Sequence, residues 1–334
     1  MLLFPTAPAR RRVLPTFSPT VTARLLIVIA FTMSGLGSVM TKGAYGLGAT
    51  PVSFLLVRLI TAVIVLVVAC GPALWRLEPR RILTLIVLGF GFGAQTLAYF
   101  SAVQIAPVAL VVVTVSTYPV VILVMDAVKS RRVPSTARLA AMAVSLLGLW
   151  LAAGSPTGRL DTGVLLALGT AVGYAVYLCL SAKALTPRTP DGPLALSPMV
   201  ATAWVMIGAL CVMVVVALVT STGPPPATAA GIAIAHGIIA TAVPIVAIYA
   251  ALQRLRTEQV AVLGPLEPIV ATGMAVLLLG ESLNLLQGLG VVVVVAAIAQ
   301  LSGVRPRAAL PRLPFTVPRQ LPAPRQPQDE DDVA

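Results

Sequence analysis

Long apolar segments recur along almost the whole chain, separated by short polar stretches, and most of the charged residues lie outside these segments. Each segment has about 20 residues, which at ~1.5 Å per residue lets a helix cross ~30 Å of hydrocarbon. This pattern predicts ten membrane-spanning helices with short connections, and it leaves no room for a soluble catalytic domain. The predicted spans are residues 22–44, 52–70, 82–104, 107–128, 137–154, 162–182, 198–219, 229–252, 257–279 and 283–303.

Composition indicates that the solvent around this chain is lipid. Hydrophobic residues make up 58% of the 334 positions and charged residues only 10%, whereas a soluble domain carries roughly 25% charge. With so few charged side chains the chain could not cover a water-facing surface. The predicted fold class is therefore an all-α polytopic membrane protein.

The net charge of +12 raises the question of a nucleic-acid partner, but the positions of the cations argue against one. With the N-terminus placed in the cytoplasm, all but three of the 23 Lys and Arg residues fall on the cytoplasmic side. The exceptions are Lys42 and Arg159 outside and Arg58 within a span. Because this bias is typical of membrane proteins, we predict a multi-pass protein of the cytoplasmic (inner) membrane with both termini in the cytoplasm.

The tails and the cysteines add no catalytic or metal chemistry. Residues 1–21 form an Arg-containing tail without a small-residue cleavage site, so the first span is expected to be retained. Residues 305–334 are rich in Pro and Arg, end in an acidic run and are expected to be disordered. Cys70, Cys179 and Cys211 lie in or at the ends of spans without paired spacing, so no disulfide framework, metal or cofactor is predicted.

The chain repeats itself with a step of 149 positions, which places Pro119 on Pro268 and AYFSAVQ on AIYAALQ. Each half holds five predicted spans and, because five is odd, the second half enters the membrane from the opposite face. Inverted duplication is the arrangement from which alternating access arises most simply, with the site between the halves. The predicted units are two inverted five-helix repeats, residues 22–154 and 155–304.

Several motifs in this frame resemble those of the ten-helix EamA-type permeases of the drug/metabolite transporter superfamily. Arg58 follows Pro51 in the second span, and the first span carries the small-residue run at 34–38. The sixth span carries GTAVGYAVYLCLSAK (169–183). The most specific segment is GPLEPIVATGMAVLLLGESLNLLQGLG (264–290), in which a Gly-Glu follows Leu-Glu-Pro after about 13 residues.

The resemblance covers residues 22–304 and implies a secondary transporter, with export as the commonest activity among relatives. One position departs from the pattern, because Arg132 stands in the first half where Glu281 stands in the second. A mechanism that needs both acidic turns is therefore not expected. Substrates vary widely within this superfamily, so the resemblance does not name a cargo.

Glu267 is the strongest candidate for chemistry at depth. It lies about ten residues, or ~15 Å, into its span, where a carboxylate costs several kcal/mol unless it is protonated, hydrated or paired. Pro265 and Pro268 flank it and remove helical N–H donors, and Pro119 is the matching helix break in the first half. A broken helix beside a midplane acid is typical of transport sites that exchange protons. The alternative is an acid that pins the two halves together.

Arg58 lies about 10 Å deep, so it either faces a cavity, pairing with a substrate anion or with Glu267, or extends outward to the interface. His236 either relays protons or makes a helix contact. The amide and aromatic groups in the same layer could orient a small solute or simply join helices, at ~0.6 kcal/mol per bond. These groups are Gln95, Tyr99, Tyr118, Tyr174, Tyr177 and Trp204.

Taken together, these patterns predict a secondary transporter that moves a small metabolite or drug-like solute by alternating access. We expect an exporter coupled to protons, whose partners are a small-molecule substrate and the lipid bilayer; a homodimer is left open. An enzyme is disfavoured because the sequence lacks the residue sets for hydrolysis or prenyl transfer. The alternative that stays open is a flippase for lipid or lipid-linked substrates on the same scaffold.

Overall fold

The computed structural model describes residues 19–106, 108–131, 135–152, 162–185, 196–261, 263–264, 266–279, 285–286, 288–290, 292–293 and 296–297. These residues form helices and the turns between them, with no strand among them, which confirms the predicted all-α class. Residues 1–18 of the predicted N-terminal tail, the predicted C-terminal tail, most of the predicted span 283–303, and Pro265 lie outside the described residues, whereas residues 19–21 belong to the first helix.

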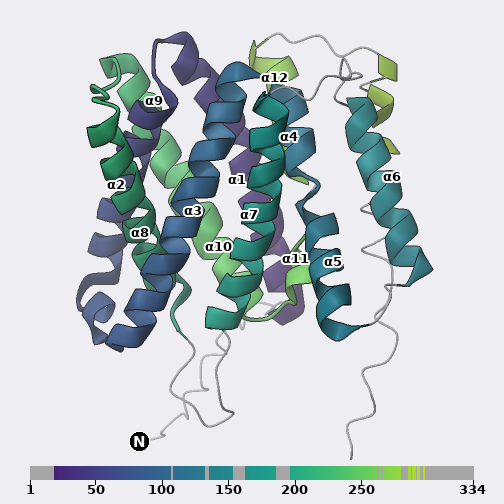
Figure 1. Ribbon diagram of the computed structural model, residues 1–334, viewed down its shortest axis with the longest axis horizontal. Coiled ribbons are helices and arrows are strands. Elements are labelled where there is room, and N and C mark those ends of the chain that lie inside the picture. The colour runs from purple at the N-terminus through teal and green to yellow at the C-terminus, as the bar shows by residue number, and fades with distance from the viewer. Residues whose placement is uncertain are drawn as a thin grey trace, which may run out of the picture.

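The helices run between two edges of one bundle, called here the lower and the upper edge after the view in Figure 1. The first half contains α1 (Pro19–Gly46), α2 (Pro51–Cys70), the 3₁₀ segment η1 (Gly71–Arg76), α3 (Pro79–Ile105), α4 (Val108–Val115), α5 (Tyr118–Ser130) and α6 (Thr136–Ala152). The second half contains α7 (Thr162–Leu185), α8 (Pro198–Val219), α9 (Ala227–Gly237), the π-helical segment η2 (Ile238–Ala242), α10 (Val243–Leu252), α11 (Thr257–Ala261) and α12 (Leu266–Leu279).

The first helices of the two halves run in opposite directions, since α1 begins at the lower edge and α7 at the upper edge (Figure 1). Within the described residues, six continuous helical segments have the length and apolar character needed to cross a bilayer. Large apolar side chains point outward from them, including Val68 at 76% and Leu218 at 74% exposure. Such a surface is stable only in lipid, so the chain is a multi-pass membrane protein.

Prolines account for where several helices begin. Pro51, Pro79 and Pro198 each occupy the first turn, where the missing N–H costs nothing. Thr50 adds a capping box to α2, because its hydroxyl accepts from the Ser53 N–H at 3.2 Å while Ser53 Oγ accepts from the Thr50 N–H at 3.0 Å. The capping box thereby stabilises the first turn of α2, at the upper edge of the bundle.

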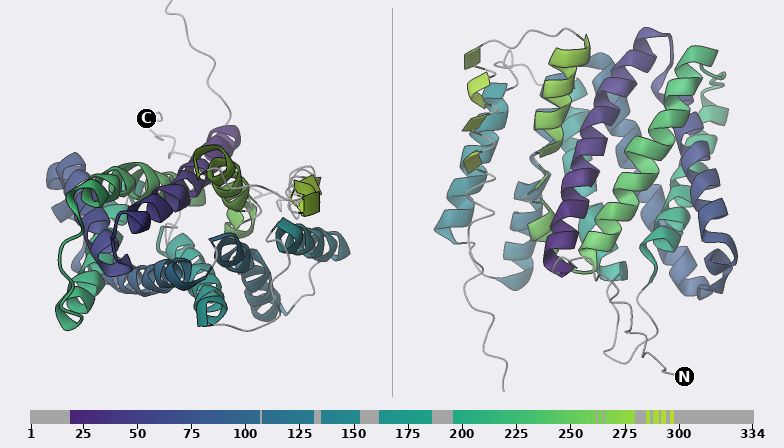
Figure 2. Two further views of the ribbon diagram at one scale, coloured as in Figure 1. Left: turned by 90° about the horizontal axis from the view of Figure 1, so that it is seen from above. Right: turned by 180° about the vertical axis from the view of Figure 1, so that it is seen from behind.

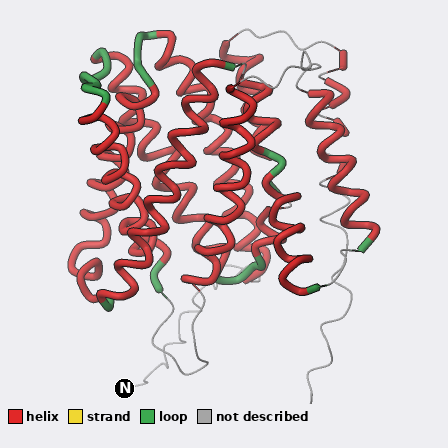
Figure 3. Tube along the Cα trace, in the orientation of Figure 1, coloured by secondary structure: helices red, strands yellow, loops and turns green. Residues whose placement is uncertain are grey.

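Two predicted spans, 107–128 and 257–279, are not single helices, and each is divided near a proline that the sequence gives as a helix break. The first is divided into α4 and α5 at Ser116–Thr117, and the second into α11 and α12 around Leu263–Gly264. Figure 3 shows the first break as a loop segment inside the bundle. The physical reason in the first case is Pro119, which lacks an N–H and disfavours helical backbone before it.

The two halves pack through closely approaching backbones. Helix α3 lies against α7 and α8, while α1 lies against α10 and α12 (Figures 1 and 2). A Cβ atom added to Gly89 would lie 2.8 Å from the Cα of Gly208, and the carbonyl oxygen of Val205 is closer still. Gly89 and Gly93 of GFGFG therefore serve helix packing, which is typical of small residues in membrane interfaces.

This contact gives a stability prediction with a control in the same motif. Gly89→Val is expected to lower the melting temperature in detergent by roughly 5 °C or more, because overpacking forces α3 away from α8. Gly91→Val, two residues away, has no atom within 4 Å of its added Cβ, so it should change the melting temperature little. Equal shifts for both variants would contradict the packing role of Gly89.

Candidate functional site

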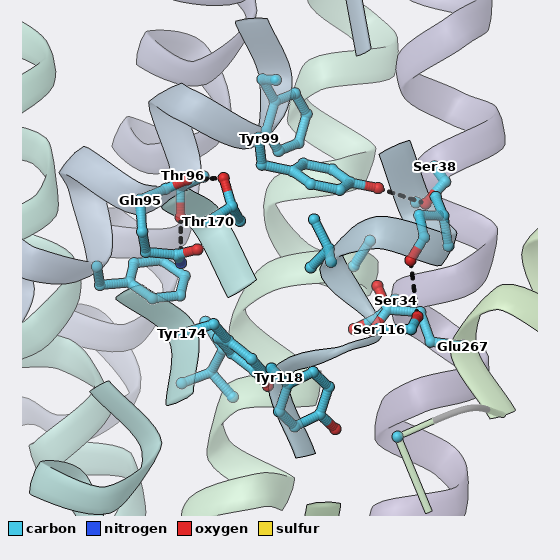
Figure 4. Close-up of a pocket in the computed structure, with 18 of the residues that line it drawn as sticks. Ser34, Ser38, Gln95, Thr96, Tyr99, Ser116, Tyr118, Thr170, Tyr174 and Glu267 are labelled. Atoms are coloured by element: carbon cyan, nitrogen blue, oxygen red, sulfur yellow. Dashed lines mark hydrogen bonds between the residues drawn. The ribbon is translucent and has the colours of Figure 1, made fainter. Parts of the chain in front are cut away.

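A cavity of about 140 Å³ lies inside the bundle, where α1, α2, α3, α7, α9, α10 and α12 meet the break between α4 and α5. Both halves contribute to its wall, and most of the side chains that point into it are polar (Figure 4).

Glu267 lies in the first turn of α12, directly after the turn that separates this helix from α11. The helix N-terminus favours an acidic side chain there, and the Glu267 N–H donates to the Gly264 carbonyl at 3.0 Å. Helix α1 approaches so closely that a Cβ on Gly35 would lie 2.7 Å from the Glu267 carbonyl oxygen. The carboxyl group faces the cavity and forms no salt bridge with any described residue.

Arg58 also lines the cavity, and it does not extend outward to the interface. Its side chain is 5% exposed, and the guanidinium carbon lies 4.7 Å from the centre of the Phe100 ring. Cation–π stacking on an aromatic face stabilises such a buried cation. Its Nε has no hydrogen-bond partner, so part of the hydrogen-bonding capacity of the guanidinium is unused.

His236 lies beside Phe54 and Phe100. Its ring centre is 5.2 Å from that of Phe54, and its Nδ1 lies 3.3 Å from Thr241 Oγ1. Thr241 in turn donates to the His236 carbonyl at 3.2 Å across the π-helical segment. His236 is therefore both a helix contact and part of the cavity wall, and its role as a proton relay stays a prediction.

A polar wall of three residues from α3 and α7, defined here as Gln95, Thr96 and Thr170, stands opposite Glu267 (Figure 4). The Gln95 amide donates to Thr96 Oγ1 at 2.9 Å, and the Thr170 hydroxyl donates to the Leu166 and Gln95 carbonyls at 2.9 and 3.3 Å. Gly173 lets α7 approach, since its added Cβ would lie 2.9 Å from Gln95 Cβ. The wall presents hydroxyl and amide groups to a solute.

Tyrosines bound the cavity above and below in the view of Figure 4. The Tyr99 hydroxyl lies 3.3 Å from Ser38 Oγ and so joins α3 to α1. Tyr118 and Tyr174 meet edge to face, with ring centres 4.9 Å apart. The Tyr118 hydroxyl is buried and has no hydrogen-bond partner.

Two of the expected residues do not line the cavity. Tyr177 lies beyond Tyr174 along α7, and its hydroxyl is 2.9 Å from that of Tyr249. Trp204 faces η1, where its Nε1 donates to the Leu74 carbonyl at 3.2 Å. The residue count gives a position along a helix, whereas the direction of each side chain depends on neighbouring helices far away in sequence.

Two of the three prolines that the sequence gives as helix breaks lie among the described residues. Pro119 follows the helix break in the first turn of α5, Pro268 is buried in α12, and Pro265 lies outside the described residues. Small hydroxyl side chains were not singled out for the site, although five of them line it. A polar side chain inside an apolar span is the signal that could have found them; they are Ser34, Ser38, Thr96, Ser116 and Thr170.

Metal chemistry has no obvious donor set here. Among the described residues, no three His, Cys, Asp or Glu side chains come together in an arrangement that could hold a metal ion. The charged groups on the cavity wall are one carboxyl group and one guanidinium, which suit an organic solute better than a cation.

Comparison with known proteins agrees with this architecture. The model of the EamA-like transporter family matches residues 21–154 and 161–303. The threonine/homoserine exporter RhtA of Escherichia coli K12 is 29% identical over 294 residues, and that of Salmonella typhimurium LT2 is 28% identical over 304. Both alignments cover 87% of this chain and 93% of the relative.

A solved crystal structure shares the fold, with a TM-score of 0.64 at 19% identity over 85% of this chain and 96% of the other. The family match spans most of the chain and falls on its two halves. The chain therefore belongs to the EamA-like transporter family, a family of ten-helix membrane transporters, and is not an enzyme.

Proposed function

We propose that this protein exports a small amino acid, holding the carboxylate at Arg58 and the ammonium at Glu267. The observation that carries the proposal is the presence of two opposite charges on the wall of one cavity without a salt bridge to each other. An unpaired charge in the membrane interior is costly and is typical of a substrate or ion pathway. A zwitterion supplies the missing partner to both groups at once.

The size of the cavity supports a small substrate. A cavity of ~150 Å³ accepts a ligand of about six heavy atoms such as benzene, and this one measures about 140 Å³ before any adjustment of its walls. An amino acid with a short side chain is of this order, whereas an acyl chain is much longer. Nothing in the relatives or in the cavity supports the lipid-flippase alternative.

The polar wall of Gln95, Thr96 and Thr170 favours a substrate whose side chain forms hydrogen bonds. Two relatives are named as exporters of threonine and homoserine, whose side chains both carry a hydroxyl group. A site built around polar groups discriminates against an apolar analogue, because that analogue leaves the buried groups unpaired. We therefore place threonine-like amino acids first among the substrates.

Glu267 provides a route to proton coupling in this proposal. The carboxylate binds either the substrate ammonium or a proton, so the two compete for one group. Alternating access of the two halves then exchanges an outgoing amino acid for an incoming proton. Location in the cytoplasmic membrane, cytoplasmic termini and a homodimer stay predictions from sequence.

The test is counterflow in proteoliposomes that contain the purified protein. Labelled threonine should accumulate against internal threonine or homoserine, while valine, which replaces the hydroxyl group with a methyl group, should compete at least tenfold more weakly. Arginine and tryptophan should compete poorly because of their size. Absence of counterflow for every amino acid in the panel would rule out the proposed substrate class.

A further inference from the structure

Equivalent hydroxyl contacts from the two halves lie on either side of the cavity, one toward each edge of the bundle. Toward the upper edge, the Tyr45 hydroxyl of α1 donates to the Phe100 carbonyl of α3 at 3.3 Å. Toward the lower edge, the Tyr249 hydroxyl of α10 lies 2.9 Å from that of Tyr177 and 3.2 Å from Ser181 Oγ, both on α7. In each case the first helix of a repeat is joined to its third span.

Comparison of the two repeats shows how the contact toward the upper edge differs from the contact toward the lower edge. The step of 149 positions places Phe100 on Tyr249, so the same position carries a hydroxyl group in the second half only. At the upper edge the aromatic rings of Phe54 and Phe100 stack, with centres 5.9 Å apart, without a hydroxyl group between them. At the lower edge Tyr249 is fully buried and holds two side-chain hydroxyl groups.

The contact of Tyr249 with Tyr177 and Ser181 lies directly beyond the cavity. Tyr174 lines the cavity, and Tyr177 and Ser181 follow about one and two turns further along α7 toward the lower edge. Ile248 of α10 also lines the cavity, and Tyr249 is the next residue. Any path from the cavity to the lower edge between α7 and α10 must therefore separate these hydroxyl groups.

Tyr118 adds a further buried hydroxyl group beside Tyr174. It belongs to the first turn of α5, next to Tyr174, and points away from the rest of the cavity wall (Figure 4). A buried hydroxyl group without a partner is unfavourable in this arrangement. Water that enters when the lower side opens would supply that partner while replacing the bonds of Tyr249.

We infer that Tyr249, Tyr177 and Ser181 form the gate on the side of the bundle where α1 begins, and that their hydroxyl bonds bias the transporter toward closure on that side. The inference rests on the proposed function, because only a transporter that opens alternately to both edges needs such a gate. In the orientation predicted from the basic residues, the gate faces the cytoplasm. Breaking the hydroxyl bonds of Tyr249 would admit substrate from that side.

The experiment measures opening directly and needs no substrate. Spin labels are placed at Lys183→Cys and Arg254→Cys, two exposed positions at the lower ends of α7 and α10, after the three native cysteines have been replaced. Distance distributions are recorded by electron–electron double resonance in lipid nanodiscs. Tyr249→Phe removes two hydrogen bonds of average strength in a membrane. It should therefore raise the population with the longer label distance, relative to the population with the shorter one, about eightfold.

Two further variants make the outcome decisive. Ser181→Ala removes one of the two bonds, so it should raise the same ratio about threefold, and it tests the gate even if Tyr249→Phe does not fold. Tyr45→Phe removes the hydroxyl bond at the upper edge and should not increase the lower separation. The inference would be overturned if Tyr249→Phe and Ser181→Ala both left the distance distribution unchanged. It would also be overturned if Tyr45→Phe increased the population with the longer distance equally. Both outcomes are informative whether or not an amino acid is transported.

Discussion

Replacing Arg58 with glutamine is expected to weaken amino-acid binding about 100-fold while the protein stays folded. The guanidinium is buried in the cavity wall, and its Nε has no hydrogen-bond partner. Charge-assisted hydrogen bonds of ~1.5–3 kcal/mol to a substrate carboxylate would be lost. The fold should survive, because removing an unpaired buried charge also removes its desolvation cost. Binding of labelled threonine to purified protein measures the change.

A substrate analogue separates this role from a general disturbance of the site. Threoninol carries an alcohol in place of the carboxylate, so wild-type protein should bind threonine far more tightly than threoninol. In Arg58→Gln the two ligands should bind almost equally. Arg76→Gln is the matched control, because Arg76 is an exposed residue at the end of η1. Undiminished preference for threonine in Arg58→Gln would exclude a carboxylate contact at Arg58.

The sequence predicted the membrane fold and its family because both depend on properties that hold along the chain. Lipid as solvent demands long apolar helices, and an inverted repeat leaves matching motifs at a fixed distance. Both predictions are confirmed by the all-helical structure and by the family match. The breaks inside two spans are indicated by prolines and not by hydrophobicity, because apolar residues continue on both sides of each break.

The site was predicted less completely, because the position of a residue along its helix does not determine the direction in which its side chain points. Counting residues placed Glu267 and Arg58 within the membrane, and both line the cavity. The same count placed Trp204 in the middle layer, but α8 turns it toward Leu74. Thr96 and Thr170 were not predicted to line the site, since a lone hydroxyl residue in an apolar span usually bonds to its own helix. Only the packing of α3 against α7 brings them together.

Conversion of Glu267 to glutamine is expected to lower proton-driven export at least 50-fold while substrate exchange continues. Glutamine keeps the shape of the side chain, and its amide oxygen still accepts a hydrogen bond from an ammonium group. It cannot take up or release a proton, so a pH gradient has no group on which to act. Export from proteoliposomes with and without an imposed gradient, alongside exchange without one, measures the two activities separately.

Two companion variants decide between coupling and structure at Glu267. Glu267→Asp keeps the carboxyl group and should retain part of the response to the gradient, whereas a purely structural role would make it no better than glutamine. Glu78→Gln removes an exposed acid just before α3 and should behave like the wild type. Because only a titrating group on the transport path converts a proton gradient into substrate movement, gradient-driven export by Glu267→Gln at the wild-type rate would move the coupling site elsewhere in the chain.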